Sequence, residues 1–366
     1  MKSSIKIIVA FFACTLLAGI MYAGNKDRSG SAGGSELLIN PWARSSGWAG
    51  ANMAGTHGLE GQFLNVAGMA FTKKSEILFS HTNYLKGSGI GINAFGFSQK
   101  VGASGVLGLG IVSMNFGDIM VTTADLPEGG IGTFSPSFMN IGLSYSKGFT
   151  DRIFGGMTFK VINQQISNAR AAGVALDAGI QYISGKDNST HFGIALKNVG
   201  PKMNYSGDGL SFRITPKTGV ASSATTNNSF NVDQRSESFD LPSQLSIGGS
   251  HDFYVGGDTT GHLHRVSPAA TFVSNSFSKD EFRLGVEYGF KTYLMLRVGW
   301  TWESGIGNDD NSKTVYRTTA QKGLSAGFTF EVPLRKETGS SFGLDYSYRA
   351  TNPFLGTHSI GLRMNL

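Results

Sequence analysis

Cysteine is nearly absent from this sequence. The 366 residues contain one, Cys14, inside an N-terminal segment where two lysines precede an apolar run over 7–20 and Ala23 follows. That order predicts a secretory signal peptide over 1–23, because the run is too short to cross a bilayer. Lipoprotein cleavage before Cys14 is the less favoured alternative, since bulky residues precede it. The processed chain would have no cysteine, which excludes disulfide bonds and thiol catalysis.

Charge, proline and long apolar runs are also scarce. Charged residues make up 15% of the chain and proline occurs 9 times, whereas glycine occurs 51 times. Soluble domains average about 25% charged residues. The net charge of +6 is scattered without a Lys/Arg run, which argues against nucleic-acid binding. No internal stretch of about 18 apolar residues could form a membrane-spanning helix. High glycine with few charges favours a β structure that has two crowded faces.

A two-residue period dominates the sequence after residue 70. Between 356 and 366, for example, large residues such as Ile360 and Leu362 alternate with small or polar ones such as Gly361 and Arg363. Such alternation predicts strands with unlike faces. We expect strands at 75–84, 88–100, 104–115, 136–149, 151–163, 171–184, 189–199, 242–254, 262–275, 280–290, 292–303, 320–332, 338–350 and 356–366.

The lengths of the connections supply an independent signal. The long ones, at 116–135, 164–170, 200–241 and 304–319, all follow odd-numbered strands. Short turns on one side and long loops on the other are typical of outer-membrane barrels. The sequence therefore predicts an all-β, transmembrane antiparallel β-barrel of about 14 strands. Its large residues would face lipid, its small polar residues would face the lumen, and its last strand would pair with its first.

Two regions depart from this simple alternation. Strands between about 75 and 116 are apolar on both faces, so they either cover a plugged interior or have a register shifted by one residue. The barrel is expected to span residues 71–366. Ahead of it, residues 24–36 are Gly/Ser-rich and are expected to be flexible. Residues 37–70 lack a strand period and predict compact turns and short helices, which would form an N-terminal plug.

The plug segment carries a family resemblance. Its opening "LLINPWARSSGWAGANMAG" and the following "GQFLNVAGMAFTKKSEILFSHTNYL" resemble the PorV/PorQ family of Bacteroidetes, itself similar to FadL-type transporters. Val66 stands where that family has proline, and "GIALKNVGP" at 193–201 is also similar. The residues that carry the plug motif are Asn40, Pro41, Ala43, Arg44, Asn65 and Ala67.

This resemblance implies a bacterial outer-membrane barrel of 14 strands with an N-terminal plug. It further implies a role in type IX protein secretion, with a large translocon barrel and a secreted cargo protein as partners. The alternative is a FadL-like channel for hydrophobic small molecules, which would need an apolar pocket at the plug and a lateral opening. The apolar chain end at Leu362, Met364 and Leu366 is similar to the signal that the barrel assembly machinery reads, which usually ends in phenylalanine.

Charged residues at lumen-facing positions form the main set of candidate site residues. Their mixed signs predict cross-strand ion pairs, with a role in holding the plug or in a transport path as alternatives. Arg44 of the plug would dock onto lumen carboxylates through a bidentate fork. The predicted lumen charges are Asp177, Arg283, Glu287, Arg297, Glu303, Asp345, Arg349 and Arg363.

No motif predicts a metal, a cofactor or an enzymatic activity. His251, His262 and His264 flank one turn, and we interpret them as a solvated rim cluster rather than a metal site. The run 308–312 lacks EF-hand spacing, and no G-x-S-x-G elbow lies in a strand–turn–helix context. The polar loop 200–241 is either a mobile surface loop or a partner-binding surface.

Overall fold

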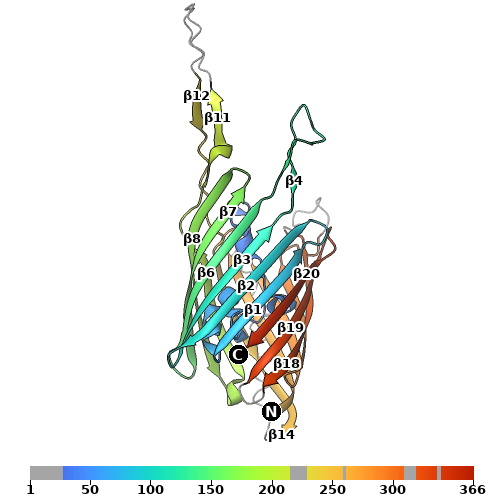
Figure 1. Ribbon diagram of the computed structural model, residues 1–366. Coiled ribbons are helices and arrows are strands. Elements are labelled where there is room, and N and C mark those ends of the chain that lie inside the picture. The colour runs from blue at the N-terminus through green and yellow to red at the C-terminus, as the bar shows by residue number, and fades with distance from the viewer. Residues whose placement is uncertain (1–27, 215–228, 259–260, 309–318, 336–338) are drawn as a thin grey trace, which may run out of the picture.

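The computed structural model describes residues 28–214, 229–258, 261–308, 319–335 and 339–366. Fourteen strands pair antiparallel with their sequence neighbours, and β20 pairs with β1 to close the ring (Figure 1). They are β1 (Ser75–Tyr84), β2 (Ile90–Val101), β3 (Gly105–Asn115), β6 (Ser137–Gly148), β7 (Ile153–Ile166), β8 (Ala169–Ser184), β9 (Thr190–Val199), β13 (Gln244–His251), β15 (Gly261–Asn275), β16 (Glu281–Phe290), β17 (Leu294–Glu303), β18 (Gln321–Arg335), β19 (Ser340–Thr351) and β20 (Thr357–Asn365). The predicted closed barrel is confirmed, and each predicted strand corresponds to one of these.

Long and short connections lie at opposite ends of the barrel. The long-loop end carries two small hairpins and a short edge strand: β4 (Ile119–Met120) with β5 (Thr133–Phe134), β11 (Ser211–Ile214) with β12 (Phe230–Asp233), and β10 (Tyr205–Ser206) on β8 (Figure 1). At the short-turn end, β14 (Phe253–Asp258) continues β13 and pairs with β15. The loop expected at 164–170 is wrong, because β7 and β8 extend until only residues 167 and 168 connect them. Polar residues there hid the strand period.

The two faces of the wall differ as predicted. On β20, Ile360 and Leu362 are 50% and 41% exposed on the outside, whereas Ser359 and Arg363 are 0% and 5% exposed on the inside. The same alternation runs around the ring. A closed ring leaves no unpaired backbone in hydrocarbon, so an apolar outer face is stable against lipid tails. The wall is thus that of an outer-membrane β-barrel.

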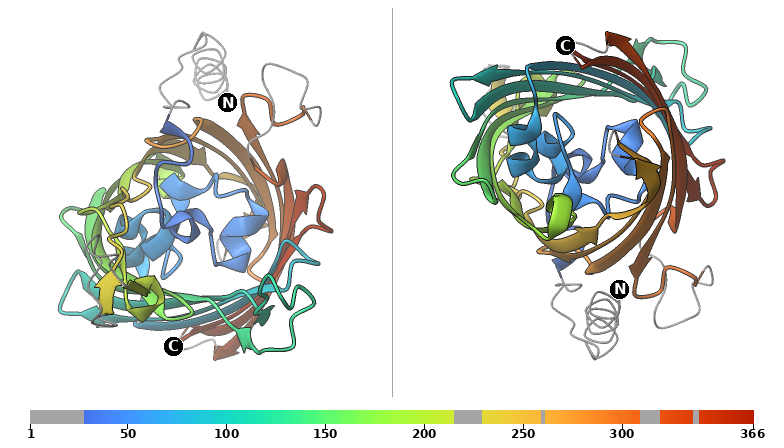
Figure 2. Two further views of the ribbon diagram at one scale, coloured as in Figure 1. Left: turned by 90° about the horizontal axis from the view of Figure 1, so that it is seen from above. Right: turned by 90° about the horizontal axis from the view of Figure 1, so that it is seen from below.

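Short helices fill part of the barrel interior (Figure 2). They are η2 (Ser35–Leu38), α2 (Ala43–Gly47), η3 (Met53–Gly55), α3 (Gly61–Leu64) and η4 (Val66–Phe71), and we call residues 28–72 the plug. None of the helices in the described segments is long and apolar enough to cross a bilayer.

The plug packs its apolar side against β1, β2 and β3. Trp42, Leu59 and Met69 are buried in one cluster with the wall residues Leu78, Ala94 and Val106. This contact explains why residues 75–116 are apolar on both faces, so of the two readings of that region the plugged interior is correct. At β3, a Cβ added to Gly108 would lie 2.1 Å from Met69 Cε, so glycine makes room for the plug.

The segment expected to be flexible is held in place over its described part. Arg28 Nη2 donates to Asp240 Oδ2 at 3.1 Å, and Gly33 N donates to the Asp240 carbonyl at 3.0 Å. Leu37 is buried in a second cluster with Ile162, Met203 and Leu241. Small residues allow this segment to pack closely on the loop before β13, which composition alone did not reveal.

The plug backbone also approaches β17 closely, at Gly299. A Cβ at Gly299 would lie 2.3 Å from the Trp48 carbonyl carbon, whereas one at Gly343, also inward-facing, would meet its nearest atom at 3.6 Å. We therefore expect Gly299→Ala to destabilise the folded barrel by about 1–3 kcal/mol through overpacking, and Gly343→Ala to have little effect. The unfolding midpoint in heat-modifiable gel migration measures this, and equal midpoints for the two variants would contradict it.

Candidate functional site

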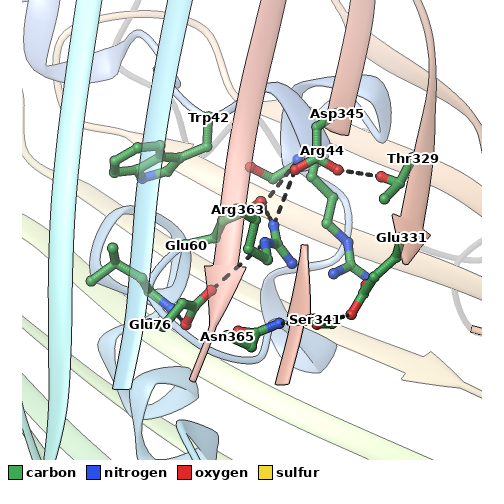
Figure 3. A network of polar contacts seen from close by, with 12 residues as sticks. Trp42, Arg44, Glu60, Glu76, Thr329, Glu331, Ser341, Asp345, Arg363 and Asn365 are labelled. Atoms are coloured by element: carbon green, nitrogen blue, oxygen red, sulfur yellow. Dashed lines mark hydrogen bonds and ion pairs between the residues drawn. The ribbon is translucent and has the colours of Figure 1, made fainter. Parts of the chain in front are cut away.

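An arginine on the closing strand holds the plug to the wall. Arg363 of β20 forms a short ion pair with Glu60 of the plug, and also faces Asp345 of β19 at 3.5 Å and Glu76 of β1 at 3.7 Å (Figure 3). All four side chains are at most 6% exposed. One guanidinium therefore compensates charges from both sides of the barrel seam and from the plug.

Two of these carboxylates also bind the plug backbone. Glu60 Oε2 accepts a hydrogen bond from Ser45 N at 3.1 Å, and Glu76 Oε2 accepts one from Leu59 N at 2.7 Å. Removing Arg363 would leave these carboxylates without their cation while they still hold the plug amides. We call the set Arg363, Glu60, Glu76 and Asp345 the seam cluster.

The polar network continues from the seam cluster across β18, β17 and β16. Thr329 donates to Asp345 and accepts from Arg297 Nη1 at 2.7 Å. Arg297 Nε in turn pairs with Glu287 at 2.5 Å, and Arg265 also binds Glu287. Direct opposition of Arg297 and Glu287 in the β16–β17 register accounts for their pairing.

Arg44 makes a weaker contact than the sequence suggested. Its guanidinium lies 3.9 Å from Glu287, with no hydrogen bond to any described residue, instead of forming a bidentate fork. Glu287 already has Arg297 and Arg265 as closer partners. Of these two charged plug residues, Glu60 and not Arg44 therefore makes the close ionic contact with the wall.

The remaining predicted lumen charges lie inside the barrel but apart from the seam cluster. Asp177 pairs with Lys160 at 2.5 Å and accepts from Asn198 N at 2.8 Å, while Arg283 pairs with Glu281 at 2.7 Å. Glu303 is buried. Arg349 is buried with two guanidinium nitrogens that have no partner among the described residues.

The plug-motif residues shape the plug itself. Asn40 Oδ1 accepts from Trp42 N at 3.0 Å, and its Nδ2 donates to Ser45 Oγ at 2.9 Å. Asn65 caps η4 through Ala67 N at 3.2 Å and donates to the Ile180 carbonyl of the wall at 3.0 Å. The methyl of Ala43 packs against Gly361 of β20, and Pro41 lines a cavity.

That cavity lies between the plug and β3, β6 and β7, with a volume of about 50 Å³. Apolar side chains form most of its lining: Leu37, Ile39, Pro41, Trp42, Phe63 and Val112. Its polar lining residues are Glu36, Gln62, Asn140, Thr158 and Lys160. We call it the apolar cavity.

A second, polar cavity of about 80 Å³ lies on the other side of the plug, against β9, β13, β15 and β16. Its lining includes Arg44, His57, His191, Arg265 and Glu287. The rings of His57 and His191 have centroids 5.5 Å apart. The largest apolar cluster of the plug thus lies toward β1–β3, whereas its side toward β13–β20 combines smaller apolar contacts of Trp48 and Met53 with most of the charged residues.

Two of the three histidines considered for a metal site, His251 and His264, have described side chains. Thr190 Oγ1 lies 2.8 Å from His251 Nδ1, and the Tyr288 hydroxyl lies 2.7 Å from His264 Nδ1, so the two bind different partners. No group of three metal-ligating side chains occurs within the described residues. The side chain of His262, residues 1–27 with the predicted signal peptide, and most of 308–312 lie outside the described parts.

The sequence reading missed several charged partners. Glu60 lies in the plug, where no period shows which side chains point outward. Glu76, Lys160 and Arg265 lie on predicted strands at inward positions, so the two-residue period could have identified them.

No family model and no curated protein matches this sequence. Among solved structures, the chain is similar to the CymD monoaromatic hydrocarbon channel, with 12% identity, 89% of this chain and 97% of that chain covered, and a TM-score of 0.49. It is also similar to the Pseudomonas putida toluene transporter TodX, with 11% identity, 88% of this chain and 96% of that chain covered, and a TM-score of 0.49. A third similar structure is a Pseudomonas aeruginosa FadL homologue, with 12% identity, 89% of this chain and 96% of that chain covered, and a TM-score of 0.46. At these identities the likenesses concern the fold alone, and nothing in them supports the finer PorV/PorQ assignment.

The seam cluster generates a test with a matched control. Arg363→Met leaves buried carboxylates uncompensated, so we expect a loss of about 3–5 kcal/mol in folding stability. Arg349→Met removes a buried arginine that has no ionic partner among the described residues, so its loss should be much smaller. Urea unfolding in detergent compares the two, and a similar cost for both would show that Arg363 is not the anchor.

Glu36 gives a pH-dependent test. Burial raises the pKa of its carboxyl, and the 2.8 Å hydrogen bond from Gln164 opposes the shift. Because the folded-state pKa is the higher one, the stabilising contribution of Glu36 is present at low pH and is lost as pH rises through that pKa.

At pH 7, Glu36→Gln should therefore strengthen the docking of η2, since glutamine can still accept from Gln164. Hydrogen exchange of a peptide covering 34–41, corrected for intrinsic rates, should show greater protection than in the wild type. The difference should shrink toward pH 4. Glu237→Gln, an exposed acid at the same end, serves as control, and faster exchange in Glu36→Gln at pH 7 would refute the assignment.

Proposed function

We propose that the protein is an outer-membrane channel that admits small hydrophobic molecules, with the plug as its gate. The apolar cavity supports this most directly. It places Trp42, Phe63 and Leu37 around one space at the plug, and its exposed lining is mostly apolar. A cavity of this composition favours an apolar ligand over a charged or sugar-like solute.

The cavity must enlarge to accept a ligand. An apolar cavity of about 150 Å³ holds benzene, whereas this one measures about 50 Å³. Its cover, η2, is held by Leu37 packing and by the Glu36–Gln164 hydrogen bond. Glu36 and Leu37 of η2 both line the cavity, so displacement of η2 would enlarge it, and η2 is the proposed gate.

A weak place in the wall offers a lateral route. The β8–β9 ladder shifts register between Leu176 and Ala178, and Asn198 takes a left-handed φ of 58°. Beyond Val199 strand β9 ends, so the long-loop end of β8 faces β10 and the apolar residues Met203 and Leu241. Side-chain packing and the two-residue β8–β10 pair close the wall there instead of a continuous ladder, so an opening would break few strand hydrogen bonds.

A second candidate is the carrier role in type IX secretion implied by the PorV/PorQ resemblance. The small hairpins at the long-loop end favour it, because they expose Phe212, Phe230 and Met120 at 51%, 55% and 54%. Exposed apolar side chains on projecting loops are typical of protein-binding surfaces. The channel remains the main proposal, since it also accounts for the cavity.

Filling the apolar cavity tests the channel. Val112→Phe on β3 points into it, whereas Leu109→Phe adds similar bulk on the lipid-facing side of the same strand. We expect the purified barrel to bind radiolabelled naphthalene above the level of empty micelles. Val112→Phe should reduce this binding about tenfold or more, and Leu109→Phe should not change it.

The outcome also separates the two candidates. No saturable naphthalene binding, together with recovery of a large translocon barrel or secreted cargo from solubilised outer membranes, would reject the channel in favour of the carrier. Binding that Val112→Phe leaves unchanged would reject the apolar cavity as the ligand site.

A further inference from the structure

Basic side chains gather along one side of the short-turn end. Lys73 and Lys74 precede β1, while Lys100 and Lys147 lie near the ends of β2 and β6. Arg152 lies in the turn before β7, and Lys186 begins the short helix η5 (Lys186–Asn188) after β8; all six are exposed. We call these six residues the basic arc. They belong to strands that are neighbours from β1 to β8, so they cover a continuous part of the rim and not scattered points (Figure 1).

Backbone hydrogen bonds join the turns that carry the arc. Lys100 N donates to the Lys74 carbonyl at 2.8 Å, which links the plug exit to the β2 end. Gly148 N donates to the Ser104 carbonyl at 3.2 Å, and Ile183 N to the Arg152 carbonyl at 2.8 Å. The charged side chains therefore project from a rim of fixed geometry.

The arc is not neutralised by the protein. No ion pair involves any of its six residues within the described chain, and the same turns expose two acids, Asp151 and Asp187. The long-loop end differs, because its exposed basic residues are matched by nearly as many exposed acids, including Asp118, Asp125 and Glu128. An uncompensated positive rim indicates an anionic partner.

Apolar and aromatic side chains accompany the arc on the outward face of the wall. The exposed fractions are 49% for Tyr145, 67% for Phe149 and 39% for Tyr182. Tyrosine and lysine together are typical of a bilayer's headgroup region, where lysine stems lie along apolar surface and their ammonium groups reach the phosphates. A soluble acidic protein would need no such aromatic border on the lipid face.

We propose that the basic arc binds the phosphates of anionic phospholipids, such as phosphatidylglycerol, in the leaflet at the short-turn end. That end faces the periplasm in an outer-membrane barrel. Each cation near an anionic surface contributes roughly a fivefold increase in affinity, and salt weakens the effect. The proposal depends on the barrel lying in a bilayer and is independent of what passes through it.

The experiment uses the full-length barrel in nanodiscs of phosphatidylethanolamine with a minor fraction of phosphatidylglycerol. After transfer to detergent at low salt, native mass spectrometry counts the phosphatidylglycerol molecules retained per barrel. The arc variant changes six residues to glutamine: Lys73, Lys74, Lys100, Lys147, Arg152 and Lys186. The control variant changes six at the other end: Lys86, Arg170, Lys202, Arg213, Arg235 and Lys322.

We expect the wild type and the control variant to retain phosphatidylglycerol in preference to phosphatidylethanolamine. In the arc variant, the ratio of retained phosphatidylglycerol to retained phosphatidylethanolamine should fall at least tenfold. Heat-modifiable migration verifies that both variants are folded. Equal retention by both variants would overturn the proposal. The proposal would also be overturned if the arc variant retained lipid like the wild type but no longer bound an acidic periplasmic protein. That result would assign the arc to a protein partner.

Discussion

The contact between Arg363 and Glu60 is the interaction on which the rest of the interior depends. Arg363 comes from the strand that closes the ring, and Glu60 comes from the plug, so one buried pair joins wall closure to plug position. Asp345 and Glu76 share the same guanidinium from the two neighbouring strands. An interior with this many charges is stable only when each carboxylate keeps its cation. This requirement fixes the position of the plug relative to the wall.

The plug meets a different environment on its two sides. Toward β1–β3, Trp42, Leu59 and Met69 bury apolar surface, and water cannot replace that contact. Toward β9 and β13–β16, apolar contacts of Trp48 and Met53 lie beside a polar cavity lined by charged residues. Water can compete for the charges that border this cavity, so the plug is expected to be hydrated more readily there than against β1–β3.

Much of the wall was predictable because lipid and lumen impose opposite chemistry on alternate residues. Arg297 and Glu287 illustrate this, since the period gave their facing and the tight turn between β16 and β17 places them opposite each other. The plug was harder to predict, because short helices and turns carry no period, so Glu60 could not be paired with Arg363 in advance. The extension of β7 and β8 was missed for a related reason: beyond the bilayer both faces meet water and the alternation fades.

The seam between β1 and β20 couples ring closure to charge balance. Leu366 N donates to the Ser75 carbonyl at 3.0 Å, so strands about 290 residues apart in chain order are neighbours in the closed ring. Arg363 lies on this closing strand, and the carboxylates that face it come from the plug, from β1 and from β19. Separating β20 from β1 would therefore open the ring and also leave Glu60, Glu76 and Asp345 without the cation they share, so the two losses are expected to occur together.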